Sequence, residues 1–323
     1  MVKIGFVGTG GIAQAHLGRL QEMEEVQIAA LCDVVEERVQ EAVEKFGGTP
    51  YTDYSRLLDE ADIDALYVCV PPFAHEEAEV LAARRGVHLF VEKPVVMDLD
   101  QGLEILAEVE KAGILSSVGY SLRYRPPWQG ARQLLQGRQV ALVAANRWGG
   151  IPGDDNHWWR VYEKSGGQLV EMATHQIDAM RWLVGDIARV HARYGRQVTD
   201  DIANMTIPDA QVVNIEFTSG AVGYISTSCA LTQGGGRSDF RVVLRDAVIE
   251  VAAEVSVSPA AALDLSELPQ EVQDIDAAFV EAVQSGQPGS ILCDYREGLK
   301  SAAVCLAANQ SAASGQPQSC WRG

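Results

Sequence analysis

The residues best suited to chemistry in this sequence lie in two separate segments. Glu92-Lys93-Pro94 follows an apolar stretch, while Glu171 and His175 lie four positions apart in a segment with helical periodicity. On a helix, this spacing places both side chains on one face, together with Asp178. A carboxylate one turn from an imidazole orients the ring and favours its protonated form, which suits a general base near neutral pH. The alternative is an ordinary surface pair on a helix.

Lys93 is expected at the carboxyl edge of a parallel sheet, where doubly wound folds bind their ligands. Pro94 fixes its own φ and biases Lys93 toward an extended backbone, which aims the ammonium group. Pro71-Pro72-Phe73-Ala74-His75 follows the preceding strand and is expected to line the same edge. Two interpretations of His75 remain open, namely contact with a cofactor or a cap on the following helix. The cofactor contacts expected at this edge are Val70, Pro71, His75, Glu92 and Lys93.

A glycine-rich turn follows the first predicted strand. Gly8-Thr9-Gly10-Gly11-Ile12-Ala13 fits the pattern G-x-G-x-x-G/A and opens a predicted helix. The first glycine permits the tight turn, the second admits a pyrophosphate, and Ala13 permits close helix–sheet packing. The phosphates would lie at the helix N-terminus, where unpaired N–H groups favour negative charge. An ordinary strand–helix turn is the alternative.

An acidic residue ends the second predicted strand. Asp33 lies 20 positions after Ala13, the distance at which a carboxylate binds the ribose diol of NAD. The same charge repels a 2′-phosphate, so NAD is expected and NADP is disfavoured. Arg38 is the nearest cation, and it is interpreted either as lying near the adenine or as a solvated helix residue.

Strand and helix patterns alternate over the first 120 residues, which predicts a doubly wound parallel sheet. The strands are expected at Val2–Val7, Val26–Cys32, Thr49–Tyr51, Ala65–Val70, Val87–Val91 and Leu115–Val118. The helices are expected at Gly10–Leu20, Val35–Phe46, Tyr54–Leu58, Phe73–Arg85 and Leu99–Ala112.

Beyond Tyr120–Trp128 the pattern changes to strands without long crossovers, which predicts a mostly antiparallel sheet. These strands are expected at Val140–Arg147, Val190–Val198, Ala210–Phe217, Val222–Cys229, Phe240–Leu244 and Ala247–Val251. The helices are expected at Trp128–Gln136, Gly167–Leu183, Asp274–Ser285 and Tyr295–Ala313. The chain is therefore expected to form an α/β protein with a first domain at residues 1–121 and a second at 122–323.

Composition excludes several classes of partner. The chain has 323 residues and a formal net charge of −18, which disfavours binding to nucleic acid or anionic lipid. No apolar run approaches the roughly 20 residues of a membrane span. The sequence starts directly with a strand and shows no signal peptide, so a cytoplasmic location is expected. The six cysteines show no metal-ligand or CxxC spacing, and no metal site is expected.

The order of these motifs resembles the glucose–fructose oxidoreductase/inositol dehydrogenase/rhizopine-catabolism (Gfo/Idh/MocA) family. It comprises the glycine turn, the acid after the second strand, P-P-x-x-H, E-K-P, and W-R…G-G-x-L-x-E-x-x-x-H-x-x-D. The resemblance implies a Rossmann domain followed by an α/β domain whose open sheet forms a homodimer or homotetramer. It also implies NAD(P)-dependent redox chemistry on sugars or cyclitols, with Lys93 and His175 as the catalytic lysine and histidine.

The sequence departs from the family pattern in three places. Glu171 stands where the family usually has Asp, Ser165-Gly166-Gly167 replaces a triple glycine, and Ser121-Leu122-Arg123 replaces Asn-x-Arg. Glu171 is expected to orient His175 or to bind a neighbouring substrate hydroxyl.

The function expected is reversible hydride transfer between NAD and a secondary alcohol of a sugar or polyol. Lys93 and His175 are expected to act on one substrate oxygen, and Arg123 or Arg160 to fix the cofactor or substrate. The substrate contacts expected are Lys93, Arg123, Trp159, Glu171 and His175. Specificity is expected from the loops Gly149–His157 and Thr232–Ser238. The alternatives are a redox-neutral NAD-dependent glycosidase or eliminase and a non-catalytic NAD-binding regulator.

Overall fold

The computed structural model describes residues 1–75 and 77–323 and divides into two compact units. Unit 1 comprises Met1–Tyr120 and Gln273–Leu299, and unit 2 comprises Ser121–Val272 and Lys300–Gly323. The single boundary expected after residue 121 assigned Gln273–Leu299 to the second domain. The structure instead packs this segment with the first unit. In the part of the chain described, none of the helices has the length and apolar character needed to cross a membrane.

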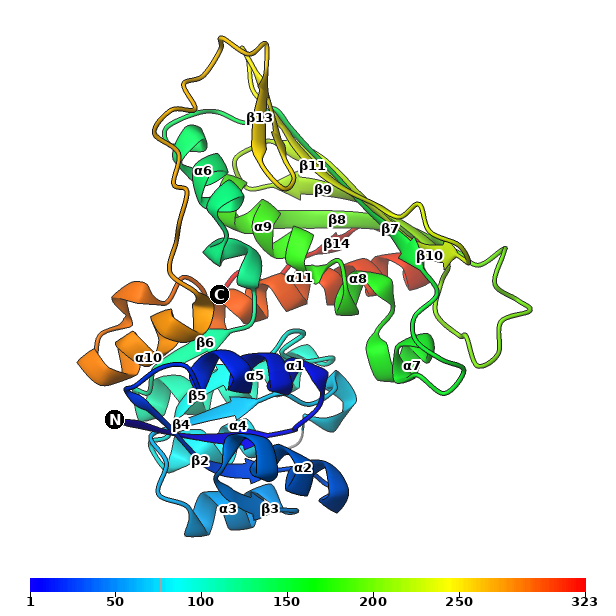
Figure 1. Ribbon diagram of the computed structural model, residues 1–323. Helices are drawn as coiled ribbons and strands as arrows, with labels where there is room; N and C mark the ends of the chain where they lie inside the picture. Colours follow the sequence, from blue (N-terminus) through cyan, green and yellow to red (C-terminus); the bar gives the residue numbers. More distant parts are fainter. Residues whose placement is uncertain (76) are drawn as a thin grey trace. The chain divides into compact units, whose positions relative to one another are not determined.

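Unit 1 is built on a six-stranded parallel sheet in the order β3-β2-β1-β4-β5-β6 (Figure 1). Its strands are β1 (Val2–Val7), β2 (Val26–Cys32), β3 (Thr49–Tyr51), β4 (Ala65–Val68), β5 (His88–Val91) and β6 (Ser116–Val118). Its helices are α1 (Gly11–Leu20), α2 (Glu36–Phe46), α3 (Tyr54–Glu60), α4 (Ala78–Arg84), α5 (Leu99–Ala112) and α10 (Ile275–Ser285), with short 3-10 turns η1 (Pro72–Ala74) and η4 (Pro288–Ser290). The predicted doubly wound sheet is confirmed.

An aromatic layer explains why α10 belongs to this unit. Phe6 on β1, Tyr67 on β4 and Phe90 on β5 are paired across neighbouring strands, and their rings stack at 4.7 and 4.4 Å. Phe279 on α10 packs edge-on against both Tyr67 and Phe90, at 5.7 and 5.6 Å. The layer is fully buried, so α10 removes a large apolar area from water that the first 120 residues alone would leave exposed.

Unit 2 contains an eight-stranded sheet in the order β13-β12-β11-β7-β10-β9-β8-β14. Its neighbouring strands are antiparallel except for the parallel pair β7 and β10, which confirms the mostly antiparallel prediction. The strands are β7 (Leu142–Gly150), β8 (Ile187–Gly195), β9 (Ala210–Phe217), β10 (Val222–Leu231), β11 (Arg237–Val243), β12 (Val248–Val251), β13 (Val255–Ser258) and β14 (Gln318–Ser319). The sequence pattern does not predict β13 and β14, which are short strands at the two edges of the sheet.

Helices cover one face of this sheet (Figure 1). They are α6 (Pro126–Leu135), α8 (Gln168–Glu171), α9 (Thr174–Val184) and the part of α11 (Tyr295–Ser314) that lies in unit 2; the short elements η2 (Ser121–Tyr124), η3 (Trp158–Arg160) and α7 (Tyr162–Ser165) connect them. The core contains Trp128, Ile177 and Val304 from the helices and Ile215 and Phe240 from the strands. Side chains alternate between buried and exposed along β9 and β10, as expected for a sheet with one covered face.

All six cysteines are buried, and none of them forms a disulfide within residues 1–75 and 77–323. Burial raises the pKa of Cys32 and of Cys305 to about 12, so both thiols stay protonated near neutral pH. Their environment is that of small core residues.

Candidate active site

The glycine turn after β1 has the backbone that a close approach requires. Gly8 has φ +90°, and a Cβ there would lie 2.4 Å from the carbonyl oxygen of Cys69, so only glycine fits. Gly10 and Gly11 border open space, since a Cβ at either would meet no atom within 4 Å. Gly10 is the N-cap of α1 and offers no side-chain cap. The first N–H groups of α1 are therefore available to a ligand.

Asp33, directly after β2, is tied to this turn. Its Oδ2 accepts hydrogen bonds from the backbone N and from Oγ1 of Thr9, each at 3.0 Å, while Oδ1 accepts from the N–H of Val35 at 3.0 Å. The carboxylate is nearly buried and fixed at the edge of the sheet. It lies where the sequence analysis expects the group that binds a ribose diol.

A hollow of about 520 Å³ adjoins the turn. It is lined by Thr9, Gly10, Gly11, Gln14, Arg38, Glu41 and Lys45. Arg38 is exposed on α2 and reaches this hollow, as does Lys45, which the sequence analysis did not single out. The open space at Gly10 and Gly11 and the cations on α2 fit a dinucleotide with its pyrophosphate at the N-terminus of α1.

The remaining predicted cofactor contacts follow β4 and β5, at the same sheet edge. Val70 adjoins the turn, because its Cγ1 would lie 3.0 Å from a Cβ at Gly8. Pro71 precedes η1, and His75 follows it. The buried His75 places Nδ1 2.6 Å from Oε1 of Glu79, which is also buried. The N-cap of α4 is Glu77, so the interpretation of His75 as a helix cap is wrong.

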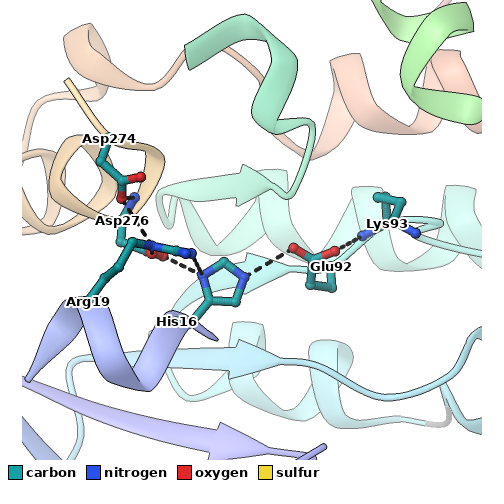
Figure 2. A network of polar contacts seen from close by, with 6 residues as sticks. All are labelled: His16, Arg19, Glu92, Lys93, Asp274 and Asp276. Carbon is teal, nitrogen blue, oxygen red and sulfur yellow. Dashed lines mark hydrogen bonds and ion pairs between the residues drawn. The ribbon is translucent and has the colours of Figure 1, made fainter. Parts of the chain in front are cut away.

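Glu92 and Lys93 follow β5 directly. The carboxylate of Glu92 accepts the backbone N–H of Lys93 at 3.1 Å and contacts Nε2 of His16 at 3.1 Å (Figure 2). The Lys93–Pro94 peptide bond is cis. His16, which was not among the residues singled out from the sequence, thus contacts the E-K-P motif. A histidine at an otherwise apolar helix position was the available signal.

In unit 2, the predicted helix over Gly167–Leu183 is wrong in one respect. It is interrupted at Met172 and Ala173, between α8 and α9. The N–H of Ala173 bonds to the carbonyl of Gln168, five residues back, and the N–H of Gln176 bonds to Ala173, three residues back. These bonds end one helix and start another, so Glu171 and His175 do not share the face of a continuous helix.

Glu171 and His175 therefore lie on either side of this break. Glu171 is the buried last residue of α8, and His175 is half-buried in the first turn of α9. The turn before α8 holds this segment in place, because Gly166 and Gly167 both have positive φ and Leu169 donates its N–H to Gln211 at 2.9 Å. Ser165, at the first position of the glycine motif, accepts the Gly167 N–H at 3.1 Å.

Asp178 forms a buried ion pair with Arg123. Arg123 donates Nε to Oδ2 at 2.9 Å and Nη2 to Oδ1 at 2.7 Å, and Ser301 donates its hydroxyl to Oδ1 at 2.8 Å. Both charged side chains are almost fully buried. Asp178 therefore links η2 to α9 and α11. The role expected for Arg123 toward cofactor or substrate remains a prediction.

Arg160 organises a loop beside a second hollow. Its guanidinium donates to the carbonyls of Pro152 and Gly153, each at 2.8 Å, and pairs with Asp155 at 2.6 Å. The hollow, of about 550 Å³, is lined by Gly150, Ile151, Asp155, Arg160, Asp201, Ile202, Ala203, Leu231, Thr232, Gln233, Gly234 and Gly236. The structure thus brings together the two loops expected to set specificity, Gly149–His157 and Thr232–Ser238.

Trp159 lies next to Arg160 in η3. Its Nε1 is buried and has no hydrogen-bond partner within residues 1–75 and 77–323. A buried indole N–H normally has a partner, so this donor is suited to a ligand.

Family models match both halves of the chain. The oxidoreductase family with an NAD-binding Rossmann fold matches residues 2–120, and the Gfo/Idh/MocA C-terminal domain matches residues 128–256. The chain belongs to the Gfo/Idh/MocA family of oxidoreductases. The family resemblance and its cofactor, NAD, are thereby confirmed, and the glycine turn and the hollow beside it fit this nucleotide.

Two similar proteins align with 98% and 70% of the chain. The uncharacterized oxidoreductase YrbE of Bacillus subtilis is 27% identical over 335 aligned positions, which cover 98% of this chain and 95% of that protein. Myo-inositol 2-dehydrogenase of Thermotoga maritima is 28% identical over 233 positions, covering 70% of this chain and 68% of the relative.

Two solved structures share the fold of this Gfo/Idh/MocA member. The WlbA dehydrogenase of Bordetella pertussis, in complex with NADH and UDP-GlcNAcA, has a TM-score of 0.84 at 22% identity and covers 98% of both chains. Levoglucosan dehydrogenase, in complex with NADH and levoglucosan, has a TM-score of 0.84 at 19% identity over 100% of both chains.

Proposed function

We propose that this protein is an NAD-dependent dehydrogenase that oxidises a secondary alcohol of a sugar, cyclitol or related polyol, reversibly. The observation that carries the proposal is the position of Lys93. It follows β5 at the same sheet edge that bears the glycine turn after β1 and Asp33 after β2. An ammonium donor at this edge is suited to an oxygen that gains negative charge beside the nucleotide.

The chemistry is divided between the nucleotide and side chains. Bound NAD supplies the acceptor for the hydride that leaves the alcohol carbon. Lys93 donates a hydrogen bond from Nζ to the alcohol oxygen and stabilises its negative charge as the carbonyl forms. His175 accepts the hydroxyl proton on a ring nitrogen. Glu171 orients His175 or accepts a hydrogen bond from a neighbouring hydroxyl.

The hollow in unit 2 supports a polyhydroxylated substrate. Asp155 and Asp201 contribute carboxylates, and Thr232 and Gln233 contribute further polar side chains. Hydroxyl groups donate readily to carboxylates, so such a lining discriminates among polyols by the positions of their hydroxyls. Inositol 2-dehydrogenase, D-xylose 1-dehydrogenase and levoglucosan dehydrogenase, the names of several relatives, fall within this substrate class.

The test is NADH formation by the purified protein with NAD⁺ and a panel of inositols, aldoses, anhydrosugars and linear polyols. We expect turnover with at least one cyclic polyol, and its loss in Lys93→Ala and His175→Ala. NAD that survives purification without net NADH from any alcohol would instead indicate redox-neutral chemistry. A Lys93→Ala variant that keeps full function in the cell would indicate a regulator.

A further inference from the structure

A buried charge cluster in unit 1 leads to the E-K-P motif (Figure 2). His16, on α1, is only 2% exposed and has a carboxylate at each ring nitrogen. Its Nδ1 lies 2.6 Å from Oδ1 of Asp276 on α10, and its Nε2 lies 3.1 Å from Oε1 of Glu92. Only the imidazolium form donates from both nitrogens, so this geometry selects the protonated ring.

Arg19 completes the neutralisation of Asp276. It donates Nε to Oδ2 at 2.6 Å. Its Nη2 also lies 2.9 Å from Nδ1 of His16, but two donors form no hydrogen bond while the ring donates to Asp276. Asp276 is thus held by Arg19 and His16 together, and His16 remains the contact between Asp276 and Glu92.

Glu92 is confined on a second side. A Cβ at Gly119, directly after β6, would lie 2.3 Å from Oε1 and 2.8 Å from Oε2 of Glu92. The carboxylate therefore occupies the space that the missing side chain of Gly119 leaves. From there its Oε2 accepts the backbone N–H of Lys93 at 3.1 Å.

These contacts form one path from α10 through α1 to Lys93. We propose that His16, held by Asp276, is a positioning residue for Lys93: it fixes the Glu92 carboxylate, and that carboxylate fixes the backbone from which the Lys93 side chain extends. The proposal rests on the proposed function only in giving Lys93 a catalytic task. The contacts themselves belong to unit 1 alone.

The direct test separates the contact of His16 with Asp276 from its contact with Glu92. In His16→Asn the amide keeps a donor near the position of Nδ1, but it is too short to reach Glu92. We expect kcat to fall about 10-fold with the KM for NAD⁺ nearly unchanged, because a misplaced catalytic group costs turnover more than binding. A simple loss of folding would instead lower the active fraction and leave kcat per active site unchanged.

Gly119→Ala approaches Glu92 from the other side and leaves the His16–Asp276 contact in place. We expect the same decrease in kcat. Gly18→Ala is the matched control, because Gly18 lies on α1 two positions from His16 and a Cβ there meets no atom within 4 Å. We expect its kcat to equal that of the wild type.

A double-mutant cycle tests the path itself. Because His16 is proposed to act through Glu92, adding His16→Asn to Glu92→Gln should lower kcat little beyond the effect of Glu92→Gln alone. Two results would overturn the proposal. One is a wild-type kcat in His16→Asn; the other is a double variant whose fold-decrease in kcat equals the product of the two single fold-decreases.

A readout without turnover separates this inference from the proposed function. The rate at which acetic anhydride modifies Lys93, followed by peptide mass spectrometry, reports on the placement of the amine. We expect faster modification in His16→Asn and Gly119→Ala and the wild-type rate in Gly18→Ala. If no alcohol reduces NAD⁺, the proposed function fails while this measurement still tests the positioning. Equal rates in all four proteins would refute the positioning.

Discussion

Nδ1 of His16 and Oδ1 of Asp276 lie 2.6 Å apart, although 260 positions separate the two residues in the chain. The pair joins α1 to α10 and puts a cation between Asp276 and Glu92 in a fully buried setting. Burial by itself lowers the pKa of His16, but the hydrogen bonds and charges of Asp276 and Glu92 outweigh it and raise the pKa to about 9.

This shift predicts a pH dependence of stability. The pKa of His16 is about 9 in the folded protein and 6.5 for an unperturbed histidine. The contribution of protonated His16 to the free energy of unfolding is therefore complete below about pH 6.5 and is lost as pH rises through about 9. The loss should be of the order of 3 kcal/mol. Arg19, Asp274 and Tyr67 also face the cluster, and burial raises the pKa of Tyr67 well above its usual value, so Tyr67 does not titrate in this window.

The measurement is the free energy of unfolding in urea across this pH range for the wild type and His16→Asn. The variant should lack most of the alkaline decrease. The same decrease in both proteins would mean that another group causes it.

Replacing Asp33 should change the choice of nucleotide. Asp33→Ser combined with Val34→Arg removes the charge that repels a 2′-phosphate and adds a cation at a position that is 88% exposed. We expect the ratio of kcat/KM for NADP⁺ over NAD⁺ to rise at least about 10-fold, because each such charge contact contributes on the order of 1–3 kcal/mol. Asp33→Ser also removes an acceptor for Thr9 and Val35, so Asp33→Asn is the milder control for stability. Equal use of NADPH and NADH by the wild type would contradict our interpretation of Asp33.

Lys93→Ala and His175→Ala should each lower kcat by about 10²–10⁴-fold, the usual effect of removing an oxyanion donor or general base. The double variant should be little slower than the slower single one, as for groups that act as a unit. Binding of NADH, measured by fluorescence titration, should change little in His175→Ala. If the two single fold-decreases in kcat multiply in the double variant, Lys93 and His175 do not act in one shared step.

We expect the Arg123–Asp178 ion pair to contribute mainly to the stability of the folded protein. Asp178→Asn removes the carboxylate from a buried guanidinium, and we expect a loss of about 3–5 kcal/mol in the free energy of unfolding. Asp186→Asn is a suitable comparison, because that carboxylate is one-third exposed in its pair with Arg181 and should contribute far less. A loss below about 1 kcal/mol in Asp178→Asn would show that the buried pair is replaceable.

The uncovered face of the eight-stranded sheet carries Trp148, Val212, Val222 and Tyr224 as exposed side chains. We propose that the homodimer or homotetramer implied by the family forms through this face. Tyr224→Glu should then lower the mass in solution, measured by light scattering, toward that of one chain. Val198→Glu also places a glutamate at an exposed apolar position, but outside the strands, and it should leave the mass in solution unaltered. If the wild-type protein has the mass of a single chain in solution, the proposed interface does not exist.

The sequence predicts the nucleotide half of the molecule well because its signals are local. The positive φ of Gly8, the N-terminus of α1 and the acid after β2 depend on residues within one βαβ unit, and all appear where expected. The alternation of strands and helices likewise predicts the parallel sheet.

Features that depend on distant residues escape such an analysis. The apolar periodicity over Gly167–Leu183 is compatible with one helix, and only the backbone bonds at Ala173 and Gln176 reveal two. Nothing near His16 indicates Asp276, and nothing near Arg123 indicates Asp178. The short strands β13 and β14 have too few residues to show a period.

Unit 1 is assembled from two stretches of chain, and this affects the order of events during synthesis. When the ribosome has produced Met1–Tyr120, the faces of Tyr67 and Phe90 that Phe279 covers are still bare, and His16 has no Asp276 beside it. The whole of unit 2 up to Val272 must emerge before α10 can close the first unit. The nucleotide-binding half, although encoded first, is therefore completed late, and a nascent chain exposes an unfinished Rossmann core through most of its translation.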